Sequence, residues 1–143
     1  MLILGHCSCG NISFELDWSP DPSEIPARAC PCTFCQAHQG IWTSSPTARL
    51  AVQIRHPALT SRHRFATQTA EFLGCTRCGD TPLVTSHIAG RLFAVVNTHA
   101  LRGDLPLRPS PGHPRLDDET RAERIERRQR SWIPDVRVDY LGS

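Results

Sequence analysis

The sequence contains no lysine, and all 16 of its basic residues are arginines. The formal net charge is only +2, which excludes the strong basic field that gathers nucleic acid around many of its binding proteins. Aromatic residues make up only 6% of the chain, which also argues against a nucleic-acid-binding zinc ribbon. We therefore expect no nucleic-acid partner.

Long apolar runs are missing too. No run approaches the roughly 18 residues that indicate a membrane span, so we expect no membrane association. The apolar start, Met1 to Leu4, is too short for a signal peptide and has no basic flank, and it favours a first β-strand instead. We expect a cytoplasmic protein, and in that reducing compartment cysteines remain thiols or bind metal.

The composition favours short strands joined by turns. The chain has a single methionine and a single tyrosine but 12 prolines and 9 glycines, which does not suit a helical bundle. Alternating or continuous apolar residues predict strands. The expected strands cover residues 1–4, 11–18, 50–54, 63–73, 92–96 and 136–140. Proline-rich segments at 19–26 and 105–114 are expected to be loops.

One segment is predicted to be helical. Asp117-Asp118 provides a helix start, and Glu119 to Arg130 is rich in strong helix formers. Its apolar stripe is thin, formed by Ala122, Ile125 and Trp132, so we expect an ion-paired surface helix. The simplest organisation is a single, mostly β domain over 1–143, in which residues 101–143 supply a loop, this helix and a final strand.

The seven cysteines fall into three tight groups. These are Cys7-Ser8-Cys9, Cys30-Pro31-Cys32-Thr33-Phe34-Cys35 and Cys75-Thr76-Arg77-Cys78. Such spacing is typical of metal ligands, because one turn brings two sulfurs to about 2.3 Å from an ion. Thiolate ligands favour zinc, and the spacing differs from that of iron–sulfur proteins. Gly10 and Gly79 follow two groups and allow a positive φ, so that amides face the sulfurs.

The number of cysteines in each group suggests two metal sites of different kinds. The outer pairs, Cys7 with Cys9 and Cys75 with Cys78, would form a closed structural tetrathiolate site. Cys30, Cys32 and Cys35 would then form a site with an open fourth position, the pattern of a catalytic or ligand-binding zinc. Spacing alone also allows the central CxxC to serve the closed site. His38 is a candidate acid–base group or fourth ligand, although a solvated loop histidine is the simpler interpretation.

The motifs resemble a known family. Gly5 to Glu15, Cys30 to Cys35 with Gly40, and Cys75 to Gly79 are similar to the glutathione-dependent formaldehyde-activating (GFA) enzymes and the related centromere protein V, over about residues 5–100. The resemblance implies a β-tent-like fold of small antiparallel sheets. It implies a structural zinc on the four outer cysteines and a second zinc on the central three, two zinc ions per chain. The activity it implies is condensation of formaldehyde with glutathione to S-hydroxymethylglutathione, a carbon–sulfur lyase reaction.

We therefore expect a zinc-dependent carbon–sulfur lyase-like enzyme that acts on a small thiol such as glutathione at Cys30, Cys32 and Cys35. The zinc of such a site suits a soft thiolate ligand better than an activated water. The alternative is a non-enzymatic zinc module that binds a protein or carries thiols, and a homodimer is compatible with both. If the second zinc is absent, Cys32 and Cys35 could exchange disulfides.

Overall fold

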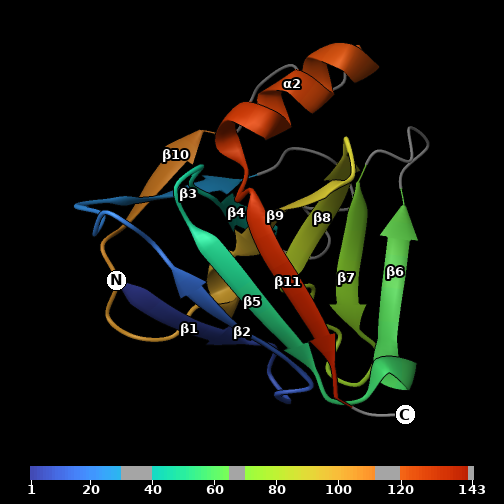
Figure 1. Ribbon diagram of the computed structural model, residues 1–143. Helices are drawn as coiled ribbons and strands as arrows, with labels where there is room; N and C mark the ends of the chain where they lie inside the picture. The colour runs from blue at the N-terminus through green and yellow to red at the C-terminus, as the bar shows by residue number, and fades with distance from the viewer. Residues whose placement is uncertain (30–39, 65–69, 112–119, 142–143) are drawn as a thin grey trace.

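The computed structural model describes residues 1–29, 40–64, 70–111 and 120–141 (Figure 1). Within them, the chain forms a four-stranded and a seven-stranded sheet and one α-helix, so the mainly β fold expected from the sequence is confirmed. The smaller sheet has the order β1 (Leu2–His6), β2 (Ile12–Asp17), β5 (Arg49–Ile54) and β11 (Asp135–Tyr140). The larger has the order β10 (Leu107–Pro111), β3 (Ile25–Ala29), β4 (Ile41–Thr43), β9 (Arg91–Asn97), β8 (Leu83–Ile88), β7 (Glu71–Cys75) and β6 (Thr60–Arg64).

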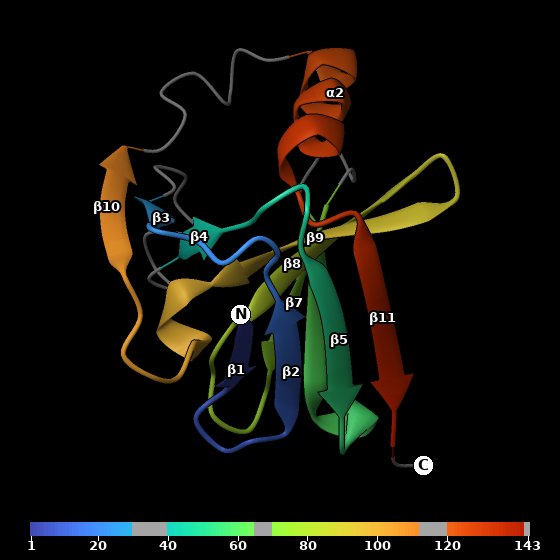
Figure 2. The same ribbon diagram turned by 60° about the vertical axis from the view of Figure 1, so that its left-hand side comes forward.

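Neighbouring strands are antiparallel except for β11 beside β5 and β10 beside β3, which run parallel. Two short 3₁₀ helices, η1 (Pro57–Leu59) and η2 (Thr98–Ala100), connect strands, and α2 (Arg121–Ser131) precedes β11. Figure 2 shows the four-stranded sheet in front of the larger sheet, with α2 above both. No helix in these described ranges is both long and apolar enough to cross a membrane.

The main core lies between the two sheets. Along β2, Ile12, Phe14 and Leu16 are buried while the residues between them are more exposed, which is the predicted period-two alternation. From the larger sheet, Leu83 and Val96 belong to the same cluster. Each fully buried aliphatic side chain of this kind contributes about 1.5–3 kcal/mol. The facing apolar rows therefore hold the sheets together.

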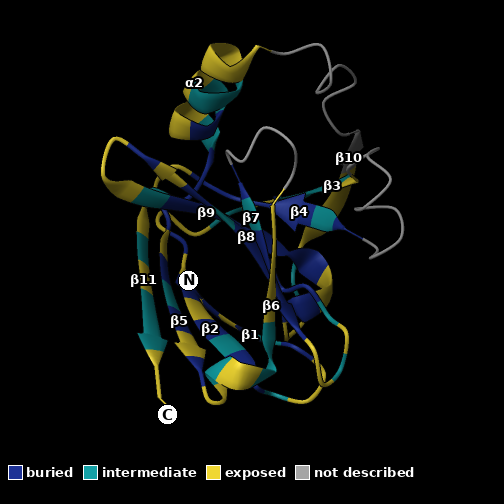
Figure 3. Cartoon of the chain, turned by 90° about the vertical axis from the view of Figure 1, so that its right-hand side faces the viewer, coloured by how far each residue is buried: buried dark blue, intermediate teal, exposed yellow. Residues whose placement is uncertain are grey.

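A second cluster covers the other face of the larger sheet. Phe93 and Val95 of β9 belong to it, whereas their neighbours Ala94 and Val96 belong to the main core. Strand β9 is therefore buried on both faces, as its continuous apolar run predicts. Trp132, directly after α2, closes this second cluster. Figure 3 shows the result, with β8 and β9 dark blue at the centre and much of α2 yellow.

The helix begins later than the sequence predicted. Thr120, not Asp117-Asp118, is its N-cap: the Thr120 hydroxyl accepts from the Glu123 amide while the Glu123 carboxylate accepts from the Thr120 amide. This reciprocal capping box satisfies two backbone donors, which a preceding acidic pair alone does not. The apolar stripe also differs, because Ala122 is exposed and Arg128 is buried, its guanidinium 5.0 Å from the Trp132 ring centre.

Two loop predictions and one strand prediction were wrong. The segments expected to be loops at 19–26 and 105–114 contribute to β3 and β10, which pair in parallel with Leu107 opposite Ile25. Proline is tolerated in β10 because this is an edge strand, where an absent N–H need not break the ladder. The single strand expected at 63–73 is two strands, β6 and β7, paired with each other. In each case the pairing partner, rather than the local pattern, decides the structure.

Candidate metal centre

The first pair of cysteines lies in the turn between β1 and β2. The Cys7 amide donates to the Ile12 carbonyl and the Gly10 amide donates to the Cys7 carbonyl, both at 2.9 Å. Gly10 has φ of +79°, which a side chain would disfavour. The turn thereby aims the Ile12 amide at the Cys7 sulfur, at 3.4 Å. As predicted, Gly10 adopts a positive φ and a backbone amide faces a cysteine sulfur.

The second pair occupies an equivalent turn at the end of β7. The Gly79 amide donates to the Cys75 carbonyl and the Cys75 amide donates to the Asp80 carbonyl, both at 2.8 Å. Gly79 has φ of +80°. The Thr76 amide donates to the Leu59 carbonyl at 2.9 Å, which fixes the turn against η1. Two similar turns from distant parts of the chain therefore face one another.

The four thiols converge. The sulfurs of Cys7, Cys9, Cys75 and Cys78 all lie within 4.8 Å of one another, with Cys7 to Cys9 at 3.8 Å and Cys9 to Cys75 at 3.5 Å. A disulfide needs about 2.05 Å, whereas a tetrahedron with metal–sulfur bonds of about 2.3 Å has edges of about 3.8 Å. The donor set and its spacing therefore fit a zinc ion.

The thiols differ strongly in their readiness to ionise. Burial raises the pKa of Cys7 to about 12, although the Ile12 amide donates to its sulfur. Burial also opposes ionisation of Cys75, but the amides of Cys78 and Arg77 outweigh it and help to lower its pKa to about 7. The Cys75 thiol is thus partly ionised near neutral pH even without a cation, and a divalent ion would bind all four cysteines as thiolates.

Two polar side chains support the cluster from outside. The Asp80 carboxylate accepts from the Ser8 amide at 2.7 Å and from the Ser8 hydroxyl, and so links the two turns directly. Asn11 is 3% exposed; its amide nitrogen lies 3.9 Å from the Cys75 sulfur and its oxygen accepts from the His56 amide at 2.7 Å. Such outer contacts orient ligands and stabilise their negative charge.

His6 is not a member of the cluster. Its Nδ1 lies 2.7 Å from the Cys7 carbonyl oxygen, and its Nε2 accepts from Arg102 Nε at 3.1 Å. Donation from Nδ1 to the carbonyl leaves Nε2 as the acceptor, so both ring nitrogens have partners.

Sequence analysis did not single out Asp80 or Ser8, although their places beside the two cysteine pairs are a usable signal.

The predicted central site, Cys30, Cys32 and Cys35 with His38, lies outside the described residues. Its flanks are described: Ala29 at the end of β3 pairs with Ile41 at the start of β4. The chain therefore leaves and re-enters the larger sheet at adjacent points.

Comparison with protein-family profiles identifies the family. The profile described as glutathione-dependent formaldehyde-activating enzyme, GFA, matches residues 2–111, a span that contains all three cysteine groups. No curated protein matches the chain. A crystal structure of a Rhodobacter sphaeroides protein is similar over 73% of this chain and 99% of that chain, with 21% identity and a TM-score of 0.49.

Proposed function

Because this chain belongs to the glutathione-dependent formaldehyde-activating enzyme family, we propose that it is a zinc-dependent carbon–sulfur lyase-like enzyme. Its proposed substrate is a thiol adduct of the glutathione and S-hydroxymethylglutathione type. One observation carries the proposal: the four outer cysteines form a complete ligand set by themselves. The three central cysteines are therefore left over for a second function.

The roles follow from this division. Cys7, Cys9, Cys75 and Cys78 would hold a structural zinc, and Cys30, Cys32 and Cys35 would hold a second zinc with one position open to substrate. A zinc ion supplies charge that keeps a coordinated thiol deprotonated near neutral pH. The central cysteines would position that thiol, and His38 is the candidate that would move the proton of the adduct hydroxyl.

Different elements of the described structure flank the two cysteine groups. The tetrathiolate cluster lies where the β1–β2 turn meets the end of β7. The segment that carries the central group instead joins β3 to β4, two strands near the other edge of the larger sheet. Loss of a ligand at one place therefore need not disturb the other. This separation is what makes the two sites distinguishable by experiment.

The first test counts zinc and reactive thiols. We expect two zinc ions per purified chain and no thiol that reacts rapidly. Cys32→Ser should lower the zinc content to one and leave the fold intact, whereas Cys75→Ser should destabilise the whole chain. A wild-type chain with a single zinc and three freely reactive thiols would contradict the second site.

The second test measures chemistry. Exchange NMR reports the rate at which formaldehyde and glutathione interconvert with S-hydroxymethylglutathione, with and without the protein. We expect acceleration by the wild type and none by Cys32→Ser. If glutathione binds in a Cys32-dependent manner but the rate does not change, the protein is a thiol carrier and the enzymatic proposal is wrong.

A further inference from the structure

The two sheets leave part of their shared interior uncovered. The register places Arg62 opposite Leu73, and Arg64 opposite Glu71. Since Leu73 belongs to the core between the sheets and side chains alternate along a strand, all four of these residues are on the inner face of the larger sheet. This face is apolar where the smaller sheet covers it and becomes charged at β6, beyond the last covering strand, β11.

A cavity of about 400 Å³ occupies this place, between β11 and strands β6 to β9. Its size is within the range of about 300–1,000 Å³ usual for small-molecule sites. Leu73, Leu92 and Val138 supply apolar walls, and Tyr140 and His87 supply polar groups at the rim. Apolar walls combined with a few polar groups are typical of a ligand site.

The charges of the cavity do not cancel. Glu71 is the only carboxylate among the described residues that line it, and it pairs with both Arg64, at 2.9 Å, and Arg62, at 3.5 Å. One positive charge therefore remains in excess. Glu71 is also the least exposed of the three, with 19% of its side chain accessible against 49% for Arg62 and 62% for Arg64. The surplus charge thus faces the opening.

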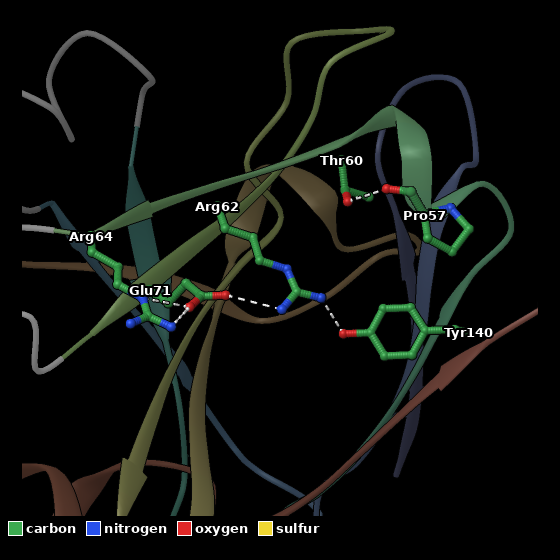
Figure 4. A network of polar contacts seen from close by, with 6 residues as sticks. All are labelled: Pro57, Thr60, Arg62, Arg64, Glu71 and Tyr140. Atoms are coloured by element: carbon green, nitrogen blue, oxygen red, sulfur yellow. Dashed lines mark hydrogen bonds and ion pairs between the residues drawn. The ribbon is translucent and has the colours of Figure 1, made fainter. Parts of the chain in front are cut away.

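Tyr140 completes the arrangement from the opposite sheet. Its hydroxyl accepts a hydrogen bond from Arg62, whose guanidinium also lies 5.6 Å from the ring centre. Figure 4 shows Arg62 placed between Glu71 and Tyr140. The neighbouring charges of β11, Arg137 and Asp139, pair with each other at 3.3 Å, and by strand alternation they are on the outer face. They do not neutralise the cavity.

We propose that this cavity binds a small organic monoanion, a carboxylate attached to an apolar aryl or alkyl body. The carboxylate would be held by the guanidinium donors of Arg62 and Arg64, a geometry that arginine favours. The apolar body would lie on Leu73, Leu92 and Val138. None of the four described cysteines lines the cavity, and the proposal does not depend on the lyase activity.

The test uses 2-naphthoate, a fluorescent aryl carboxylate, and its uncharged analogue 2-naphthamide as the matched probe. We expect saturable one-to-one binding of naphthoate that weakens with added salt, and binding of the amide at least about tenfold weaker. Equal binding of both probes, or no binding at millimolar concentration, would overturn the proposal.

Arg62→Gln is the informative variant, because Glu71 keeps its ion pair with Arg64. It should weaken naphthoate binding at least about tenfold and leave the weak binding of the amide unchanged. Arg49→Gln is the control, since Arg49 pairs with Asp135 outside the cavity. Inward charges on an edge strand can instead serve only to prevent aggregation. In that case Arg62→Gln would self-associate with naphthoate affinity unchanged, and the proposal would be wrong.

Discussion

The contact between Ser8 and Asp80 offers the sharpest test of how the metal centre is built. The two residues are 72 positions apart in the chain, and Asp80 accepts from both the amide and the hydroxyl of Ser8. The hydroxyl is the largest cause that lowers the pKa of Asp80. The carboxylate is therefore charged at neutral pH, and its contribution to stability would be lost only as the pH falls through that lowered value.

The expected effect is modest because the contact is partly exposed. A hydrogen bond to a charged group contributes about 1.5–3 kcal/mol when buried, and solvent exposure reduces this to about 1 kcal/mol for each bond. Asp80→Ala should therefore lower the free energy of unfolding by about 2 kcal/mol. Asp80→Asn and Ser8→Ala should each lower the free energy of unfolding by about 1 kcal/mol, because each loses one of the two hydrogen bonds. The asparagine oxygen still accepts from one Ser8 donor, and in Ser8→Ala the backbone amide still donates to Asp80.

The assay combines thermal unfolding with zinc transfer to a chromogenic chelator. About 2 kcal/mol corresponds to a fall in Tm of about 7 °C in a domain of this size, and zinc should leave Asp80→Ala faster than wild type. A double-mutant cycle should give a coupling between Ser8 and Asp80 of about 1 kcal/mol. Additive effects, with zinc release unchanged, would show that the two turns are held by the metal alone and would refute the reasoning.

Three further predictions follow from the described contacts. Thr120→Ala removes the N-cap of α2 and should lower the unfolding free energy by about 1 kcal/mol, while Thr120→Ser should be nearly neutral, as measured by urea unfolding. Phe72→Ala should cost about 3–5 kcal/mol, because Phe72 is 6% exposed and contacts Trp42 with ring centres 5.9 Å apart; a loss below 1 kcal/mol in the same assay would contradict the packing. Zinc removal by a chelator should increase amide hydrogen exchange first at residues 7–12 and 75–80, and uniform exchange across β9 and these turns would contradict a local role for the metal.

The predictable part of the fold is the part with local periodicity. β2, β5 and β11 each alternate apolar and polar residues, and β9 is a continuous apolar run, so their burial follows from the sequence. The cysteine turns were equally accessible, because two short cysteine pairs, each followed by glycine, already specify turns that hold two sulfurs. Spacing alone left open whether these two pairs or the central CxxC form the closed site, and the family resemblance decided it.

The remaining features depend on partners far away in the chain. Nothing local marks Leu107–Pro111 as a strand, because its ladder exists only with Ile25–Ala29. Asp80 lies beside a cysteine pair, but its role depends on distant Ser8. The inward direction of Arg62 likewise follows from pairing with β7. Short-range patterns report on propensity and periodicity, but register is a property of the assembled sheet.

The meeting of the two cysteine turns also has a consequence for how the chain is made. Cys9 and Cys75 are 66 residues apart, so a metal held by both closes a long loop. By the relation used for disulfides, closing such a loop removes about 4 kcal/mol of conformational freedom from the unfolded chain. During synthesis this closure has to wait until Cys78 has left the ribosome. The central cysteines, at 30–35, emerge well before that point, so the nascent chain carries five thiols before the first cysteine of the second pair appears.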